Sequence, residues 1–593
     1  MNKIPIIESQ QPTAAPAWAV LQRQLIRTID EAVPIFLEKY TRPNGEIIWR
    51  QSKQDGDTWA DDFYEAFFNW PLFYALGGGQ YSGSMAARQW DVITRQLEFD
   101  YDQVTNEFVN DADWFHHGEN YIYLYYLGLA NPTLAQMELR ARRFAGYYIG
   151  EDAQVRNYDP QFRIIPSPFT GGKGPLAHFP LDSMKYHLGH IHTTLGPGFE
   201  LPENWFDDDG LIAQVRARYD DIVMRGDIPV NLSVTALVTH AYLYTGEDKY
   251  RDWIVEYTEA WMERMEENGG IIPDNVGPSG RVGELRQGQW WGGFYGWTCR
   301  FSPYIVSNAI TIAAQCAHLV TGDKRYLQFL RSHLDMLLDR SIEEDGKLLV
   351  PTKHTDDGWQ DFAPLGTMEP IHLWATSMEE RDWARLERLR RGNEESWRAV
   401  QPRGPRTLDD RAWTRFLAGD FPEYPEQILQ ANYSEVCRRL DAVIHDEEDL
   451  SQVDEHHWQE RNPVVTEALV HLTTGGPQTV YWGGLAQGRV RYFDVEKKRP
   501  GLAEDTAALV TGLEADRMDL TLVNLSAGQR RQILIGAGSF GEHQFDTVEV
   551  VGEQGCVEVS GAYLQVDLQP ASQIDLRLNM KRFCNKPSYA FPF

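Results

Sequence analysis

Hydrophobic and polar positions follow a helical period along most of this chain and an alternating one near its end. Before about residue 475, long apolar stretches end in short polar turns that contain a glycine, at 72–81, 124–132, 241–250 and 316–326. Glycine accepts the left-handed conformation that often closes a helix, and a turn this short brings the next helix back antiparallel. The pattern therefore predicts a series of helical hairpins.

The two helices of each predicted hairpin differ in character. Residues 250–270 and 326–346 place apolar side chains at intervals of three and four with charges between them, which is typical of an amphipathic helix with one solvated face. The stretches before the turns, such as 121–130 and 307–320, are apolar on nearly all sides. Inner apolar helices that alternate with outer amphipathic ones indicate an (α/α) toroid. Further helices are expected at 16–40, 302–321, 370–392, 422–446 and 462–474, with a turn-rich excursion at 150–205.

After residue 475 the period changes. Six short segments between 518 and 580 alternate apolar and polar residues and are separated by Gly, Pro, Ser or acidic turns. This pattern is typical of an antiparallel β-sandwich. The sequence therefore predicts a mainly α plus β chain of two domains, an (α/α) toroid barrel of helical hairpins over 1–475 that carries catalysis and a β-sandwich over 476–593.

On these segments the chain resembles the six-hairpin (α/α) toroid superfamily of carbohydrate-active enzymes. Residues 56–78 look like the acid-bearing inner hairpins of such enzymes, and residues 243–253 are similar to their inter-helix turns. The superfamily includes glycoside hydrolases and polysaccharide lyases, and many members carry a β-sandwich beside the barrel. The resemblance covers most of 20–475 and is architectural, so it implies a fold and a broad activity but carries over no catalytic residue.

Composition excludes several other classes of protein. The formal net charge is -30, and no cluster of Lys and Arg offsets it, so neither nucleic acid nor a membrane is expected as a partner. The first residues lack the pattern of a signal peptide and no long apolar run follows, which favours a cytoplasmic location. Five scattered cysteines indicate neither disulfides nor a thiolate zinc site. We expect no cofactor and no metal, and the sequence leaves the oligomeric state open.

Two groups of titratable residues precede two of the inner helices, where a toroid places them over its central funnel. Asp61 and Glu65 are four residues apart and share one face of a helix, and Asp113 and Glu119 flank the start of the next inner helix. Two such groups could supply the carboxyl pair of a glycoside hydrolase, although helix capping by the same acids is the alternative. The candidate catalytic residues here are Asp61, Asp62, Asp113, His116, His117 and Glu119.

The turn-rich excursion carries an unusual density of imidazole. Tyr186, His187, His190 and His192 lie within a few residues of one another. No carboxylate or thiolate nearby completes a metal-binding set, so a sugar-contacting or lyase-type loop is the functional interpretation and a structural role is the alternative. Tyr186 and His187 are candidate catalytic residues, and His190 and His192 are candidate substrate-binding residues.

Two later loops, at 271–297 and 351–362, combine glycine, aromatic and polar residues. Aromatic faces stack on the C–H surfaces of sugars while polar groups bind hydroxyls, so both loops are candidate subsites. The alternative is that their tryptophans pack the loops onto the helices. The candidate substrate-binding residues, together with Glu65, are Arg281, Glu284, Trp290, Trp291, Tyr295, His354, Asp357 and Trp359.

Three functions follow, and the first is favoured. A glycoside hydrolase would use one carboxylic acid as proton donor and a second carboxylate as base or nucleophile. A polysaccharide or oligouronide lyase would instead use Tyr or His to remove a proton beside a uronate carboxylate. A non-catalytic glycan-binding scaffold is the third possibility. The expected partner is an oligosaccharide or polysaccharide, with uronate-containing chains included.

Overall fold

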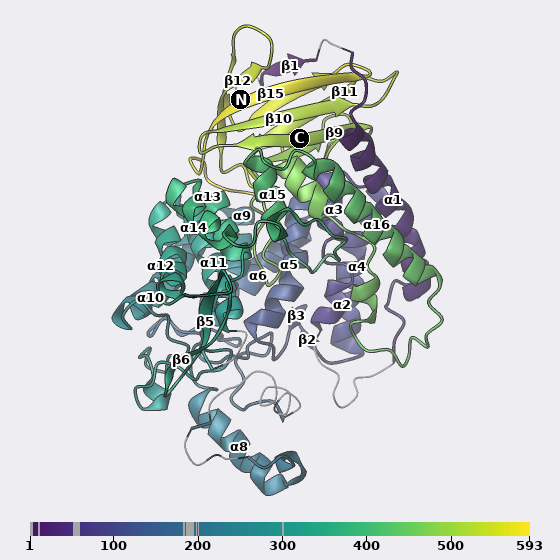
Figure 1. Cartoon of the computed structure of the whole chain (residues 1–593). Helices are drawn as coiled ribbons and strands as arrows, with labels where there is room; N and C mark the ends of the chain where they lie inside the picture. Colours follow the sequence, from purple (N-terminus) through teal and green to yellow (C-terminus); the bar gives the residue numbers. More distant parts are fainter. Residues whose placement is uncertain are drawn as a thin grey trace.

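A computed structural model describes residues 4–9, 12–50, 60–181, 184, 195–196, 199, 201–298 and 302–593. The described chain consists of a helical region followed by a strand-rich C-terminal region, and Figure 1 shows the C-terminal sheets above the helices. Helix α8 (Asp209–Ile222), which follows the predicted turn-rich excursion, lies at the end of the view opposite the sheets.

Four pairs of helices flank the four turns that the sequence predicts, but Gly128 lies inside the first helix of the second pair, so the turn of that pair, 131–134, contains no glycine. Gly246 ends the first helix of one pair in the left-handed conformation, with φ of 64°, and Gly322 follows the first helix of the next pair with φ of 71°. The pairs are α3 (Trp70–Leu76) and α4 (Gln80–Phe99), α5 (Trp114–Ala130) and α6 (Ala135–Gly146), α9 (Val234–Thr245) and α10 (Asp248–Glu267), and α11 (Ser302–Thr321) and α12 (Leu327–Asp339).

The first helix of each later pair forms the interior. All of α9 except its last residues is buried, and α5 is buried along almost its whole length. The stretch 303–321 of α11 is long and apolar enough to cross a membrane by length and composition alone, but 89% of its most apolar window is buried inside the protein. It is thus a core helix in this structure. By contrast, α10 and α12 keep one exposed face.

Packing runs from helix to helix in chain order and returns to the start. Contacts join α4 to α5, α5 to α9, α9 to α11 and α11 to α13. The last long helix, α16, then packs along α1. The remaining helices are α1 (Ala17–Tyr40), α2 (Asp61–Glu65), α13 (Met368–Ser377), α14 (Glu380–Arg390), α15 (Arg411–Leu417), α16 (Tyr424–Ile444), α17 (His457–Arg461) and α18 (Glu467–Leu469).

Three predicted helices are wrong in extent. The stretch 370–392 is two helices, α13 and α14, because Met378 adopts a left-handed φ of 54° between them. The stretch 326–346 ends as helix at Asp339. Within 462–474 only α18 and one π-helical turn, Val470–Thr474, are helical, since the chain leaves helical geometry at Asn462, before a proline.

Strands replace part of two predicted segments. Residues 342–364 form a small sheet of β4 (Ile342–Glu344), β5 (Lys347–Thr355) and β6 (Gly358–Pro364), so the predicted loop at 351–362 is mainly a β-hairpin. Asp345 and Gly346, with φ of 50° and 74°, make the turn between β4 and β5. A second hairpin of β2 (Val104–Thr105) and β3 (Phe108–Val109) precedes α5.

The C-terminal region contains two five-stranded sheets, in the orders β1-β14-β11-β7-β8 and β13-β12-β15-β10-β9. Both sheets contribute to one hydrophobic cluster, for example through Ile535, Leu522 and Leu576. The six segments predicted as strands correspond to β10–β15. The strands are β1 (Ile6–Glu8), β7 (Val490–Asp494), β8 (Arg499–Pro500), β9 (Thr506–Leu513), β10 (Arg517–Asn524), β11 (Arg531–Ala537), β12 (Gln544–Val550), β13 (Val557–Gly561), β14 (Tyr563–Leu568) and β15 (Ser572–Lys581).

Residues 475–489, which we call the connecting segment, link the last helical turn to β7 and pass between the inner helices. The N–H of Gln478 donates to Asp410 (3.1 Å), and its carbonyl accepts from Nε2 of His372 on α13 (2.8 Å). Near β7, Gly488 donates its N–H to the hydroxyl of Ser539 (2.8 Å). The connecting segment is therefore held at both of its ends.

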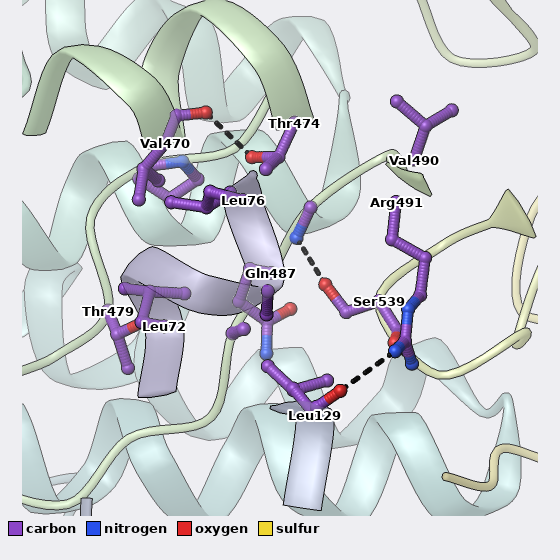
Figure 2. A pocket seen from close by; sticks show the side chains of 14 residues that line it. Leu72, Leu76, Leu129, Val470, Thr474, Thr479, Gln487, Val490, Arg491 and Ser539 are labelled. Carbon is purple, nitrogen blue, oxygen red and sulfur yellow. Dashed lines mark hydrogen bonds between the residues drawn. The ribbon is translucent and has the colours of Figure 1, made fainter. Parts of the chain in front are cut away.

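A small cavity lies where the connecting segment meets α3, α5 and β7. Figure 2 shows its apolar lining, which includes Leu72, Leu76 and Leu129, and the hydrogen bond from Arg491 to the carbonyl of Leu129 (3.0 Å). Its volume is about 40 Å³. Ligand pockets are typically several times to tens of times larger, so this cavity is a packing void and not a sugar site.

Candidate active site

The first group of predicted acids lies on α2, a helix of five residues. Its apolar residues pack on aromatic rings: Phe63 against Trp458 (5.4 Å between ring centroids) and Tyr64 against Trp90 (4.7 Å). So short a helix has little stability of its own, and these contacts hold it in place. Its three acids are buried as a result, with exposed fractions of 5%, 3% and 1% for Asp61, Asp62 and Glu65.

The second group lies at the start of α5. Asp113 caps the helix, because its Oδ1 accepts from the N–H groups of Phe115 (2.9 Å) and His116 (3.2 Å). The same carboxylate accepts from Nδ1 of His116 (2.9 Å to Oδ2) and from the hydroxyl of Tyr295 (3.1 Å). Capping thus fixes the orientation of His116 as well as the end of the helix.

The two groups of acids meet in space. A carboxylate oxygen of Asp61, one of Glu119 and a ring nitrogen of His116 all lie within 4.8 Å of one another. Oxygens of Asp61, Asp62 and Glu65 do the same. Asp61 belongs to both triplets, so it lies at the centre of these five residues, which we call the acid cluster.

Arg406 supplies a positive charge to the acid cluster from a distant part of the sequence. Its guanidinium lies 3.3 Å from Oε2 of Glu65 and 3.8 Å from Oε1 of Glu119. It also lies 5.3 Å from the ring centroid of Tyr481, a cation–π contact with the connecting segment. The side chain of Arg406 is 38% exposed, so it forms one open side of an otherwise buried cluster.

Burial and neighbouring acids favour the protonated forms of Asp61 and Glu65. Burial raises the pKa of Asp61 well above its ordinary value, and the charges of Asp62, Glu119 and Glu65 raise it further. Burial and Glu119 do the same to the pKa of Glu65, although Arg406 opposes them. Within the described residues, Oδ1 of Asp61 and both carboxyl oxygens of Glu65 have no hydrogen-bond partner.

Glu119 has a different electrostatic environment from Asp61. Burial raises its pKa, His116 and Arg406 limit the rise, and the resulting pKa is about 7. His116 is positively charged: burial by itself would lower its pKa, but the Asp113 carboxylate outweighs burial and the pKa rises to about 9. Burial and three neighbouring carboxyls dominate at Asp61, although His116 lies within 4.8 Å of it and the charge of Asp61 also acts on Arg406. Cations are thus a main influence on the pKa of Glu119, whereas burial and acids are the main influences on that of Asp61.

Asp62 joins α2 to α17. It accepts a hydrogen bond from Nε2 of Gln459, and Nε2 of His456 lies 3.7 Å from its Oδ1. Burial raises the pKa of Asp62 to about 6, and His456 limits the rise. Asp62 is thus tied to its neighbours, unlike Asp61.

Aromatic side chains from four segments surround the start of α5, and we call them the aromatic rim. Phe115 stacks on Tyr295 (6.0 Å between centroids) and on Trp482 (5.4 Å), and Trp482 meets Tyr304 edge to face (4.4 Å). Tyr304, near the start of α11, is 41% exposed. The rim therefore adjoins the acid cluster along α5 and reaches solvent at Tyr304.

Two glycines allow the connecting segment to approach α5. A Cβ on Gly118 would lie 2.2 Å from the carbonyl oxygen of Trp482, and one on Gly483, whose φ is 97°, would lie 2.8 Å from Cα of Gly118. The two backbones are thus in direct contact. The backbone of Trp482 therefore lies against Gly118, whose neighbours in α5 are His117 and Glu119.

Asp274 organises the loop that carries Tyr295. It is fully buried and accepts from the N–H groups of Gly292 and Gly293 (both 2.8 Å) and Trp297 (2.7 Å). A Cβ on Gly296 would lie 2.1 Å from its Oδ2, so only glycine fits there. The loop is therefore rigid where Tyr295 reaches across to Asp113.

Among the described residues, several other candidates proposed from the sequence lie apart from the acid cluster. Nε2 of His117 donates to the carbonyl of Thr170 (3.0 Å), and burial lowers the pKa of His117 to about 4, so it is a neutral, buried residue. Arg281 and Glu284 pair with each other at 3.2 Å, and Asp357 is exposed. Four further candidates lie outside the described residues: Tyr186, His187, His190 and His192.

Four of the predicted subsite residues form an aromatic group of their own. His354 on β5 lies 4.7 Å from the ring of Trp290, 5.3 Å from that of Trp291 and 4.9 Å from that of Trp359. The 290–291 part of the loop therefore packs on the β5–β6 hairpin, as the packing alternative expects.

Sequence reasoning missed Arg406, Tyr304, Tyr481 and Trp482. Tyr304 could have been found, because it lies near the start of the predicted inner helix 302–321, where the same rule selected Asp61 and Asp113. Arg406 lies in a Pro- and Gly-containing loop and Trp482 in the connecting segment, and neither has a sequence signal of its own.

The acid cluster contains residue types that bind divalent cations. Asp61, His116 and Glu119 form one such triplet. Asp113 engages Nδ1 of His116 and, in the cluster without a cation, raises its pKa to about 9. The cluster therefore offers both groups that can transfer protons and ligand atoms for a cation.

Comparison with known proteins gives a family and distant structural neighbours. A family model described as "Domain of unknown function (DUF8034)" matches residues 6–349 and 344–470. No curated protein matches the chain. Similar solved structures include a D-mannose isomerase, at 9% identity over 66% of this chain and 89% of that chain with a TM-score of 0.38.

Two further neighbours cover more of this chain. A glycoside hydrolase family 76 mannosidase from Bacteroides thetaiotaomicron is 10% identical over 75% of this chain and 98% of its own, with a TM-score of 0.35. An unsaturated glucuronyl hydrolase from Bacillus sp. GL1 is 13% identical over 80% and 100%, with a TM-score of 0.34. These neighbours are carbohydrate-active enzymes, as the sequence resemblance implies, but likenesses this distant assign no residue or reaction to this chain.

Proposed function

We propose that this chain, which belongs to the family described as a domain of unknown function (DUF8034), is a glycoside hydrolase whose acid and nucleophile are Asp61 and Glu119. One observation carries the proposal. Two carboxyls from different helices, α2 and α5, have oxygens within 4.8 Å of each other, and their surroundings give them different tendencies to ionise. That is the arrangement which glycoside hydrolysis requires.

The proposed architecture follows from the packing. The hairpins form an (α/α) toroid, which the contact of α16 with α1 supports. The two five-stranded sheets form a β-sandwich, which their common hydrophobic cluster supports. In a toroid the starts of the inner helices converge, and α5 and α11 contribute His116, Glu119 and Tyr304 from their starts.

The proposed reaction begins with Asp61 protonated. Asp61 donates its proton to the glycosidic oxygen while the Glu119 carboxylate attacks the anomeric carbon, which breaks the bond to the leaving sugar. Asp61, now ionised, then takes a proton from a water molecule, which attacks the anomeric carbon and releases Glu119. The spacing of the two carboxyls is nearer to the roughly 5 Å of retaining enzymes than to the wider gap of inverting ones.

The other residues support this pair. The imidazolium of His116, oriented by Asp113, and the guanidinium of Arg406 favour the ionised form of Glu119. The aromatic rim offers ring faces and edges for a sugar. Among the described residues, the indole N–H of Trp482 is buried without a hydrogen-bond partner, so it could donate to a sugar hydroxyl. An oligosaccharide is the proposed substrate, with uronate-containing chains included.

The products formed from oligosaccharides test whether the protein is a hydrolase. The purified protein is incubated with a panel of oligosaccharides, and reducing ends and ultraviolet absorbance are measured together. A hydrolase releases reducing ends without a new absorbing double bond, and NMR of the first product shows the retained anomeric configuration. Absorbing products would establish the lyase alternative, and binding without any cleavage would establish the scaffold alternative.

The pH dependence tests the role of His116. Because Glu119 must be ionised, we expect kcat/KM to rise as pH passes through about 7. Replacing His116 with Asn removes a positive charge beside Glu119, so the rising limb should move up by roughly one pH unit. His117→Gln is the matched control, since His117 is neutral and its loss changes no charge. If the rising limb of the kcat/KM profile lies at the same pH in His116→Asn as in the unaltered protein, His116 does not set the ionisation of Glu119.

Substrate binding tests Trp482. We expect Trp482→Ala to raise KM for oligosaccharides by roughly tenfold, because a lost aromatic contact of this kind is worth about 1 kcal/mol or more. Trp482→Phe should recover most of the loss that comes from stacking. Trp290→Ala, in the separate aromatic group, is the control. Equal KM values for Trp482→Ala and the unaltered protein would exclude Trp482 from the substrate site.

A further inference from the structure

A second pocket lies away from the acid cluster, where α1 meets the strand-rich region. Figure 1 shows the upper part of α1 beside β9, and the two elements are in contact. The pocket has a volume of about 690 Å³. Its polar lining includes Arg23, Gln24, Arg27, Thr28, Asp505 and Ser526.

Arg23 is buried in this pocket without a partner. Its exposed fraction is 7%, and its Nε and Nη1 are inaccessible to solvent. Across the ranges that the structure describes, the guanidinium makes no hydrogen bond and no ion pair. A buried arginine is almost always paired, because an isolated charge in the interior costs several kcal/mol.

Arg23 makes no direct ion pair with the described residues, although the charges of Asp505, Asp30 and Glu504 act on it. Its neighbour Gln22 fixes α1 to β9, since its amide bonds both the carbonyl (2.9 Å) and the N–H (3.0 Å) of Ala508. The nearby carboxylate of Asp505 is already engaged by Arg27 (2.8 Å) and by Arg531 (3.1 Å). Burial and then the like charge of Arg27 lower the pKa of Arg23 to about 10, so it still carries its charge at neutral pH.

We propose that this pocket binds a small anion, through a carboxylate or phosphate group held by the guanidinium of Arg23. A guanidinium donates charge-assisted hydrogen bonds to either group. The hydroxyls of Thr28 and Ser526 and the amide of Gln24 line the same pocket and suit a ligand that also carries hydroxyls. The site is separate from the acid cluster, and it does not rest on the proposed hydrolase activity.

The surrounding charges limit the ligand to a compact anion. Glu31 and Asp505 line the pocket beside the two arginines, and the whole chain carries a net charge of -30. A polyanion would meet both carboxylates and the overall field, whereas one carboxylate or phosphate group can contact Arg23 alone. Binding should weaken as salt concentration rises.

The test is calorimetric titration of the full-length protein with two probes, sodium phosphate and sodium glucuronate, each at constant ionic strength set with sodium chloride. We expect binding of at least one probe. Arg23→Gln should weaken it by roughly tenfold to a hundredfold, as expected for a lost charge-assisted bond. Arg23→Lys, which keeps the charge and the length but not the fork, should give an intermediate affinity.

The control is Arg42→Gln, which removes an arginine paired with Glu46 outside the pocket and should leave the affinity unchanged. Binding of phosphate alone assigns a phosphate group, binding of glucuronate alone assigns a carboxylate, and binding of both supports either ligand. The proposal is overturned if neither probe binds the unaltered protein, or if Arg23→Gln and Arg23→Lys bind as tightly as it does.

Discussion

Replacing Asp61 with Asn is expected to lower kcat by roughly 10²- to 10⁴-fold, the usual contribution of a positioned general acid. Replacing Glu119 with Gln should cost at least as much, because the second carboxyl then cannot form the covalent intermediate. Both substitutions keep the shape of the side chain and remove only its acid chemistry. The measurement is kcat on the oligosaccharide that the product assay identifies, with Glu263→Gln, an exposed acid paired with Arg163, as the control.

The roles of the two carboxyls can be distinguished by the compound that restores activity to each variant. An aryl glycoside whose phenol is a strong acid leaves without protonation, so it should restore the rate of Asp61→Asn and not that of Glu119→Gln. Azide should restore the rate of Glu119→Ala by occupying the position of the lost carboxylate, with a glycosyl azide as product. If both variants keep near-normal activity on the natural substrate, the assignment of this pair is wrong.

The same substitution at Glu119 should make the protein more stable at high pH. Burial raises the pKa of Glu119 from an ordinary value of 4.5 to about 7, so the folded protein holds the proton more tightly than the unfolded chain. The cost of ionising the buried carboxyl is absent below pH 4.5, grows between 4.5 and 7, and is complete above 7. At pH 8 it amounts to about 3 kcal/mol.

Denaturant unfolding of Glu119→Gln at pH 8 and at pH 4.5 checks this sign. The variant should exceed the unaltered protein in stability at pH 8, and the difference should vanish at pH 4.5. An inactive variant that is also more stable has lost chemistry and not structure. A variant less stable at pH 8 would show that the ionised carboxylate is stabilised by Arg406 and His116 more than burial penalises it.

Gly118→Ala is expected to destabilise the protein by about 1–3 kcal/mol, although alanine is the better helix former by about 1 kcal/mol. The new Cβ would lie 2.2 Å from the carbonyl oxygen of Trp482 and 2.4 Å from its carbonyl carbon. Both are backbone atoms, so no side-chain rotation can relieve the overlap. The connecting segment must move, and Trp482 moves with it.

Two measurements test the effect of Gly118→Ala. Denaturant unfolding gives the loss of stability, and kcat/KM should fall because the aromatic rim loses Trp482. The matched control is Gly146→Ala at the end of α6, where a Cβ meets no atom within 4 Å, and where the change should be neutral or stabilising by up to about 1 kcal/mol. A Gly118→Ala variant as stable as the unaltered protein would contradict the close approach of the connecting segment to α5.

The sequence predicted the elements of the fold better than their limits. The four hairpins and the strands β10–β15 are where the periods place them, because helical and alternating periods are local properties. β7 and β9 were missed since most of β7 and the first five residues of β9 are buried on both faces, so their apolar residues do not alternate with polar ones. β1 was missed because its partner, β14, lies at the other end of the chain. Asp345 and Gly346 turn the end of the predicted helix 326–346 into part of a β-hairpin, for a local reason that periodicity does not detect.

The candidate site was partly predictable for the same reason. The rule that residues at the start of an inner helix face a common centre selected Asp61, Glu119 and His116, and these three do lie together. The rule could not rank them. Their pKa values depend on burial and on Asp113, Arg406 and one another, which are properties of the assembled cluster.

The sequence alone determined which stretches are helices or strands, which helices are apolar and buried on nearly all sides, and which acids lie at the starts of those helices. Only the tertiary structure decided that Arg406 and Trp482 join those acids, that His117 is turned away to Thr170, and that Arg23 is buried without a partner. The physical reason is that periodicity reports the side of an element on which a residue lies. Charge compensation and close backbone approach depend on segments that are hundreds of residues apart in the chain and adjacent only after folding.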